Sequence, residues 1–460
     1  MASGSHIFFT APWDPMVVRR GDALGLRAFT EVLADAVAPD LSNRIIDGRW
    51  VTILSWCLVR SQEIYHTSGG QSVLMRSNQN ERYAWLRPLE LMWVARTMDL
   101  VGNYQERTLA GQRSVRPWLE NGSRRAHRFG LSEDQFRAYR QTGMYGGYRL
   151  AFRRWPNMTV RGDGWTPGPA TIELAKWLEG KLRRARPSWR LYANDDEGEL
   201  TKKSVNSGIG KEDEWWLRKW NNFKEGSRNV DFDTLPRPRN DYARLPESEL
   251  LKPLIFGTDT IGQKRLSVIR EIQRSTAQEH IEICEHLGSV FAKDQVIALL
   301  PHFSRLADSG MEAMDFVANA LREEGQISLT NLTKKRGAKT VCKRLVNAAQ
   351  RWNTSIRPLL HHIKSANDFA LKVQREDPRD CLSALLTYHE ECGGGLRWFV
   401  LRDGKIEPRT PLRTGSSRYR FRLWPLARLA KQCGVLRNMP LSLRRDYEVK
   451  EDEFVEDANE

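Results

Sequence analysis

The sequence predicts a mainly α-helical, multidomain protein with a small basic α+β unit near its C-terminus. The chain has 460 residues, and at roughly 100–200 residues per domain this length suggests several domains. Apolar residues recur at helical spacing through the N-terminal and central parts of the chain. After Gly393–Gly395 the pattern changes to the alternation that is typical of β-strands.

Composition and patterning divide the chain into five consecutive segments. They are a helical N-terminal domain (1–186), an irregular linker region (187–253), a helical domain (254–392), a basic α+β unit (393–445) and an acidic tail (446–460). The linker region contains clusters of turn-forming residues, such as Ser207–Gly210 and Pro236–Asp241. These clusters indicate a domain boundary.

In the N-terminal domain, apolar stripes predict three helices. They run from near Asp22 to before Pro39, from about Gly48 to Tyr65 and from about Ala84 to Leu100. A glycine-rich joint is expected at Gly143–Gly147. A further helix is expected after it, with Thr166 as its N-cap and Pro167 at its first position, because both residue types are favoured there.

The later segments combine helices with short strands. Helices are predicted near residues 263–288, 290–307, 310–323, 338–352 and 354–372. Strands are predicted at Leu396–Leu401, Lys405–Glu407 and Arg418–Leu423, followed by a helix around Pro425–Gln432. The first two strands should form a hairpin, because Asp403-Gly404 suits a two-residue turn.

The charge of the chain indicates a polyanionic partner. Lys and Arg number 72 against 57 Asp and Glu, which gives a net charge of +15. Carboxylates crowd residues 446–460, so the rest of the chain is more basic than this total. A positive field concentrates polyanions, of which nucleic acid is the commonest. The acidic tail either competes for a basic face or keeps the protein in solution.

Three groups of cations are the candidate nucleic-acid contacts. They are Arg418, Arg420 and Arg422 in the third predicted strand; Arg124, Arg125 and Arg128 in the arginine-rich segment 113–154; and Lys334, Lys335 and Arg336 before a predicted helix. Strand alternation would place the first group on one face, where it could follow a phosphate backbone. The third group could hold a phosphate together with the free N–H groups of the helix N-terminus.

Each group also has an alternative explanation. The first could be an edge strand that carries charge against aggregation. The second could reflect the arginine bias of the whole sequence, and the third could be a solvated loop. Nucleic-acid binding is favoured for the first group because its unit is so basic: residues 397–445 contain thirteen Lys or Arg against Asp403 and Glu407.

The sequence predicts no catalytic residue, no cofactor and no metal site. Asn206–Lys211 imitates a phosphate-binding loop, but Glu212 stands where Ser or Thr is required. A zinc site from Cys381, His389, Cys392 and Cys433 lacks the usual close cysteine pair. The six scattered cysteines are therefore expected as free thiols in a reducing, cytoplasmic setting. No apolar run reaches the roughly 20 residues of a membrane span, so no membrane contact is expected.

The N-terminal stretch has a family resemblance. The residues that show this resemblance are Asp22-Ala23-Leu24-Gly25, the apolar helix that follows, Pro39–Ser42, Arg44 and Arg49-Trp50. This stretch resembles the opening of uncharacterised proteins from bacterial DNA-modification and phage-defence gene clusters. The resemblance implies a defence-associated setting and transfers no functional residue.

These observations predict a nucleic-acid-binding accessory subunit of a bacterial defence or DNA-processing complex. DNA is favoured as the nucleic acid, and other protein subunits are expected as partners. Two alternatives stay open: a nuclease-type enzyme whose active site has no recognisable motif, and a non-catalytic scaffold whose basic faces bind acidic proteins.

Overall fold

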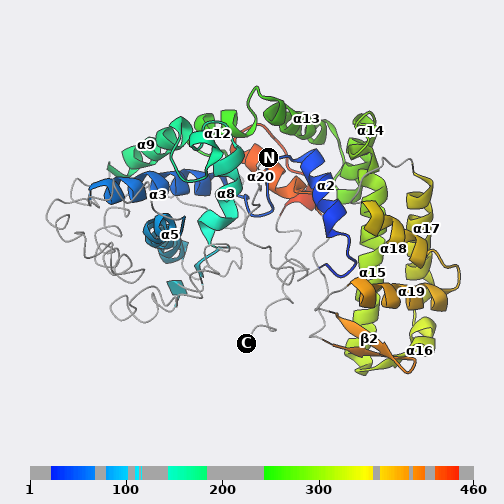
Figure 1. The fold of residues 1–460 in the computed structure, drawn as a ribbon. Coiled ribbons are helices and arrows are strands. Elements are labelled where there is room, and N and C mark those ends of the chain that lie inside the picture. Colours follow the sequence, from blue (N-terminus) through cyan, green and yellow to red (C-terminus); the bar gives the residue numbers. More distant parts are fainter. Residues whose placement is uncertain are drawn as a thin grey trace, which may run out of the picture. The chain divides into compact units, whose positions relative to one another are not determined.

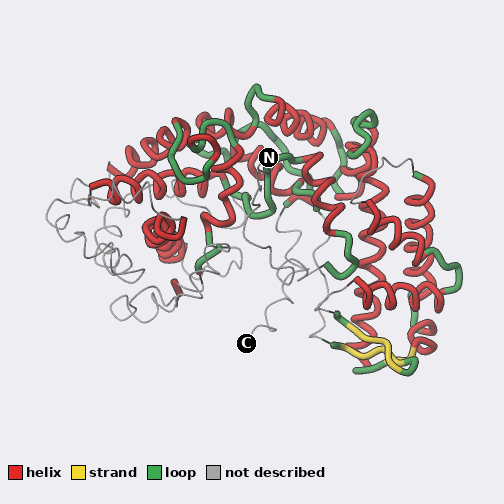
Figure 2. Tube along the Cα trace, viewed as in Figure 1, coloured by secondary structure: helices red, strands yellow, loops and turns green. Residues whose placement is uncertain are grey.

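The structure, a computed structural model, describes nine stretches of the chain. The described residues are 22–67, 79–101, 109–112, 115–116, 143–183, 243–355, 363–392, 397–409 and 420–444. Within them the chain is mainly helical with one small antiparallel sheet (Figures 1 and 2), so the predicted fold class is confirmed. None of the helices in these ranges combines the length and the hydropathy that a bilayer crossing requires.

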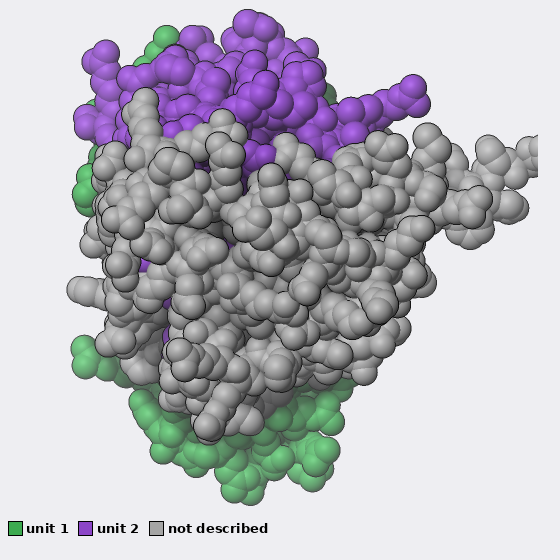
Figure 3. Space-filling view, turned by 90° about the vertical axis from the view of Figure 1, so that its left-hand side faces the viewer, with its two compact units in different colours: residues 1–37, 274–421, 440–460 green, residues 38–273, 422–439 purple. Residues whose placement is uncertain are grey.

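The chain forms two compact units, and each is built from segments that are distant in sequence. Unit 1 comprises residues 1–37, 274–421 and 440–460, and unit 2 comprises residues 38–273 and 422–439 (Figure 3). The predicted division into consecutive segments therefore differs from the units. The expected α+β unit at 393–445 is divided, because its strands belong to unit 1 and its helix to unit 2.

Unit 2 is built around a buried helix. Its elements are α3 (Gly48–Thr67), α5 (Gln79–Val101), α8 (Met144–Arg154), η2 (Val160–Gly162), α9 (Pro169–Arg183), α12 (Ser248–Ile255), α13 (Thr260–Arg274) and α20 (Leu423–Gln432). The last residue of α13, Arg274, is counted with unit 1. Helix α3 packs against α5, α8 and α9. Residues 47–58 are all buried, so the first half of α3 has no face in water. Its polar side chains must therefore find partners inside the protein.

Two local predictions in unit 2 are wrong. The expected joint at Gly143–Gly147 lies at the start of α8, where Gly147 allows the side chain of Arg44 to approach closely. Helix α9 begins at Pro169 and not at Pro167. Pro167 instead forms a β-bridge with Thr159, so the chain is still extended at that position.

Unit 1 is a helical core with the sheet at one end. Its elements are α2 (Arg27–Val37), α14 (His280–Val290), η6 (Ile297–Leu299), α15 (Leu300–Glu324), β1 (Ile327–Ser328), α16 (Leu329–Lys334), α17 (Ala338–Thr354), α18 (Lys364–Val373), α19 (Pro378–Cys392), β2 (Phe399–Arg402), β3 (Lys405–Pro408) and η8 (Leu441–Leu443). Helix α17 packs along α15, and α18 and α19 pack on α17 (Figure 1). The predicted break between residues 307 and 310 is absent, because α15 continues through Gly310.

The sheet of unit 1 has the strand order β1-β3-β2, and both pairs are antiparallel. The predicted Asp403-Gly404 turn is confirmed. Asp403 and Gly404 have φ values of 49° and 73°, and positive φ at both positions is what a type I′ hairpin turn requires. Strand β1 was not predicted, since two residues are too few to show a pattern.

The predicted strand at Arg418–Leu423 is wrong where the structure describes it. Phe421 and Arg422 have φ values of 46° and 58°, and α20 begins at Leu423. Phe421 and Leu423 are buried, as the alternation predicts, but Arg422 is buried as well, with 8% exposed. A six-residue alternation cannot separate a strand from a turn that leads into an amphipathic helix.

Helices α16 and α17 form a helix-turn-helix connection. Ser328 caps α16 by accepting a hydrogen bond from the Asn331 N–H at 3.1 Å. The turn that follows has three residues, Lys335 to Gly337, and Gly337 has a φ of 98°. We call α16, this turn and α17 the helix-turn-helix connection, because two helices joined by a short turn that contains Gly are the elements of that motif.

Replacing Gly337 by Ala should destabilise unit 1 by about 1–2 kcal/mol, because an L side chain is strained at positive φ. Space is not limiting, since an added Cβ would lie 3.9 Å from Phe316 Cε2. Gly180→Ala is the control: Gly180 lies inside α9 with no atom within 4 Å of an added Cβ. It should stabilise the protein by roughly 0.5–1 kcal/mol. Denaturant unfolding measures the change in the free energy of unfolding for both variants. If both variants were stabilised, or both destabilised, the prediction would be wrong.

Candidate nucleic-acid interface

Two of the three arginines predicted in the third strand, Arg420 and Arg422, lie in the described residues, and they do not share an exposed strand face. Arg420 is half-buried, and its guanidinium donates to the Ser442 carbonyl at 3.5 Å. Arg422 is buried and lies just before α20. No exposed strand face carries these two side chains. Arg418, like Arg124, Arg125 and Arg128, lies outside the described residues.

The third predicted group lies on the helix-turn-helix connection. Lys334 ends α16, and Lys335 and Arg336 are the first two residues of the turn. Lys335 is held in place by Glu323 at 2.6 Å and Glu324 at 2.8 Å. These hydrogen bonds raise the pKa of Lys335 above its ordinary value. The charge of Lys335 is therefore paired, whereas Lys334 and Arg336 are exposed and have no ion pair among the described residues.

Helix α17 continues this charge, and the sequence prediction included only its beginning. Residues 334–355 contain seven cations and no acid. Five of these cations are exposed and form no ion pair with any residue that the structure describes: Lys334, Arg336, Lys339, Lys343 and Arg351. We call these five side chains the basic face. Arg344 differs from them, because it pairs with Glu312.

The basic face is opposite the face that packs into the core. Lys339 and Lys343 are four residues apart and lie side by side on α17, and Arg351 is exposed two turns further along the helix. The predicted apolar stripe of the same helix is confirmed. It consists of Ala338, Val341, Leu345, Ala348 and Trp352, all buried. Packing of this stripe holds the cations in water.

The charges of α17 do not stabilise the free helix. Like charges four residues apart repel, and cations near a helix N-terminus oppose the macrodipole. Arg336, Lys339 and Lys343 all lie at or near this N-terminus, and no side chain caps it. A polyanion would reverse the sign of both effects, because phosphates would bind the cations and the free N–H groups together.

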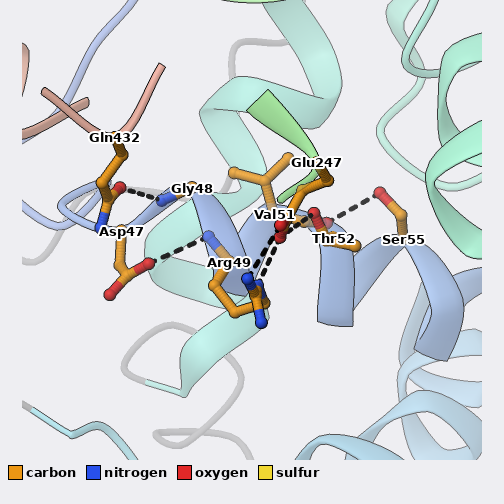
Figure 4. Close-up of polar contacts among 8 residues, drawn as sticks. All are labelled: Asp47, Gly48, Arg49, Val51, Thr52, Ser55, Glu247 and Gln432. Carbon is orange, nitrogen blue, oxygen red and sulfur yellow. Dashed lines mark hydrogen bonds and ion pairs between the residues drawn. The ribbon is translucent and has the colours of Figure 1, made fainter. Parts of the chain in front are cut away.

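Unit 2 contains a buried polar cluster of a different kind (Figure 4). Arg49 donates to both oxygens of Glu247, at 2.8 Å for the Nη2–Oε2 bond, and both side chains are fully buried. Gln432 accepts the Gly48 N–H at 2.8 Å. Asp47 forms an ion pair with Arg428 at 3.1 Å. The cluster ties α3 to α12 and α20.

Burial raises the pKa of the Glu247 carboxyl, and the neighbouring Arg49 opposes that shift. The ion pair has no exposed atom at which a substrate could bind, since the side chains of Arg49 and Glu247 are both 0% exposed. We therefore assign this cluster to stability rather than to catalysis.

The zinc alternative finds no support in the described residues. Both ring nitrogens of His389 are in use: Nδ1 bonds to the Ala23 carbonyl and Nε2 accepts the Trp398 N–H, each at 2.8 Å. Burial lowers the pKa of His389. Within the described ranges, no group of three or more His, Cys, Asp or Glu side chains could hold a metal ion.

Comparisons of the chain with family models, with curated proteins and with solved structures found no match. No functional residue is therefore transferred from a relative. The functional argument depends on the basic face and on the elements that position it.

Proposed function

We propose that the protein binds duplex DNA through α16 and α17, as an accessory subunit of a bacterial defence or DNA-processing complex. The basic face carries this proposal. It consists of five exposed cations, without an ion-pair partner among the described residues, on one helix-turn-helix connection whose second helix has no acid. The resemblance of the N-terminal stretch to defence-associated proteins supplies the biological setting.

The shape of this segment favours a duplex. Helix α17 has 17 residues, so it is roughly 25 Å long, and the major groove of B-DNA is wide enough to admit such a helix. In helix-turn-helix proteins the second helix lies in this groove while the first crosses the backbone. The major groove of A-form RNA is too narrow for side chains to read, which favours DNA.

The side chains between the cations also suit a groove. Thr340, Asn347 and Gln350 are exposed on α17. Asn and Gln can form two hydrogen bonds with adenine, and Thr contacts base edges or the thymine methyl group. These three side chains could therefore contact base edges if α17 lies in the groove.

The test is the triple variant Lys339→Gln, Lys343→Gln, Arg351→Gln. Each phosphate contact contributes about 0.9 to the slope of log K on log salt, so the slope for a duplex should fall by up to roughly 2.7. Folding should be unchanged, because all three side chains are exposed. Fluorescence anisotropy with labelled duplex at several salt concentrations measures the slope.

The matched control removes three exposed cations elsewhere in unit 1: Lys293→Gln, Arg375→Gln, Arg379→Gln. Its slope should stay close to that of the natural chain. An equal fall in both variants would indicate an effect of net charge alone. Equal affinity of the natural chain for duplex and for polyglutamate would favour the scaffold alternative and overturn the proposal.

A further inference from the structure

We infer that the tip of the β2–β3 hairpin, Arg402–Lys405, is a second contact to the backbone of the same duplex. Arg402 and Lys405 would bind phosphate on the strand that α16 crosses. This inference rests on the proposed function, because it assigns a partner to the hairpin only if α17 binds DNA. Neither residue belongs to the three groups of cations that the sequence predicts as contacts.

The first observation is a pair of like charges at the tip. Arg402 and Lys405 are cross-strand partners in the β2–β3 ladder, and both are exposed. Like charges directly opposite each other destabilise a hairpin. Neither side chain forms an ion pair within the described part of the chain. A bound phosphate would remove the repulsion and would accept hydrogen bonds from both side chains.

The acid at the tip has a separate explanation. Asp403 occupies the first turn position with a φ of 49°, and Asp is one of the few residue types that tolerate this conformation. Glu407 shares the face of Lys405, but it is half-buried and lies two residues further from the turn. The proposed contact is therefore confined to the tip.

The second observation is that the tip is hydrogen-bonded to the helix-turn-helix connection. The Leu329 N–H, at the first residue of α16, donates to the Gly404 carbonyl at 3.2 Å. Ser328 pairs with Lys405 and also caps α16. Figure 1 shows the hairpin and α16 together at one end of unit 1. The tip is thus positioned before any ligand binds, which lowers the cost of ordering it in a complex.

The third observation is the distribution of charge along α16. The hairpin tip lies beside the first residue of this helix, and Lys334 of the basic face is its last residue. Six residues separate these ends by roughly 9 Å. A helix that crosses the backbone would then have cations at both ends, on either side of the strand that it crosses.

The test is the double variant Arg402→Gln, Lys405→Gln in the full chain, with the same labelled duplex. Two lost contacts should lower the salt slope by up to roughly 1.8. The thermal midpoint should stay the same or rise, because the substitution removes a repulsion. Weaker binding by a chain that is at least as stable cannot result from unfolding. The combined five-site variant should lose the sum of the two slope changes if both elements contact one duplex.

Arg409→Gln is the control, because Arg409 is an exposed cation just after β3, away from the turn. It should leave the slope unchanged, whereas Arg402→Gln alone should lower it by about 0.9. If the α17 variant lowers the slope and the hairpin variant does not, the hairpin inference is overturned and the proposed function stands. If the natural chain does not bind the duplex, the proposed function itself fails.

Discussion

Replacing Glu247 by Gln should destabilise unit 2 by about 3–5 kcal/mol, because it leaves the buried charge of Arg49 without a counterion. The variant keeps the size of the side chain, but its amide has one acceptor oxygen in place of two, so one of the two hydrogen bonds from Arg49 is lost together with the charge. Both partners are fully buried, and the guanidinium donates to both carboxylate oxygens. Hydrogen exchange of the α3 amides, together with denaturant unfolding, measures the loss within unit 2.

Two controls separate burial from charge. Glu249→Gln breaks the pair of Glu249 with Arg244, whose side chains are 69% and 59% exposed, and it should cost less than about 1 kcal/mol. The double variant Arg49→Met, Glu247→Leu should recover most of the loss, because apolar residues can replace a buried ion pair. Equal costs for Glu247→Gln and Glu249→Gln would show that burial does not matter here.

The elements that the sequence predicts well are those whose signal is local. Helix α3 is predicted at Gly48–Tyr65 and observed at Gly48–Thr67, because its apolar residues recur at helical spacing over its whole length. The Asp403-Gly404 turn is predicted because the dipeptide itself favours the required positive φ values. In both cases the residues that decide the structure are neighbours in the chain.

The features that the sequence does not predict depend on distant partners. Arg49 and Glu247 are 198 positions apart, and nothing near either residue shows that they pair. The composition of the two units depends on such contacts as well, because an apolar stripe shows which face is buried but not what covers it. Consecutive segments were therefore the natural expectation, and interleaved units are observed.

Part of the candidate interface could be predicted from the sequence, and part of it could not. The acid-free run at 334–355 is visible in the sequence, and placing its cations on a helical wheel would have extended the predicted group of three along α17. What the sequence could not show is that Lys335 pairs with Glu323 and Glu324, or that the hairpin tip is bonded to α16. Those contacts join elements whose sequences contain no signal that they pair with each other.

Replacing Trp352 by Ala should destabilise unit 1 by about 3–5 kcal/mol, because it opens a large cavity behind α17. The indole is fully buried and meets Phe29 and Phe303 edge to face, with ring centroids 5.7 and 5.9 Å away. Its N–H donates to Asn367 Oδ1 at 3.0 Å, so an acceptor also loses its donor. Thermal unfolding measures the loss, and Trp352→Phe should cost less because it retains part of the aromatic packing.

The same substitution tests how the core positions the basic face. Trp352 is adjacent to Arg351 in sequence, yet one side chain is buried and the other exposed. Trp352→Ala removes no charge, so the folded fraction should bind duplex with the salt slope of the natural chain, and affinity should fall only as that fraction falls. The triple α17 variant should show the opposite behaviour, with a lower slope and an unchanged thermal midpoint. A lower slope for Trp352→Ala at temperatures where it is fully folded would mean that the cavity moves the cations away from the phosphates.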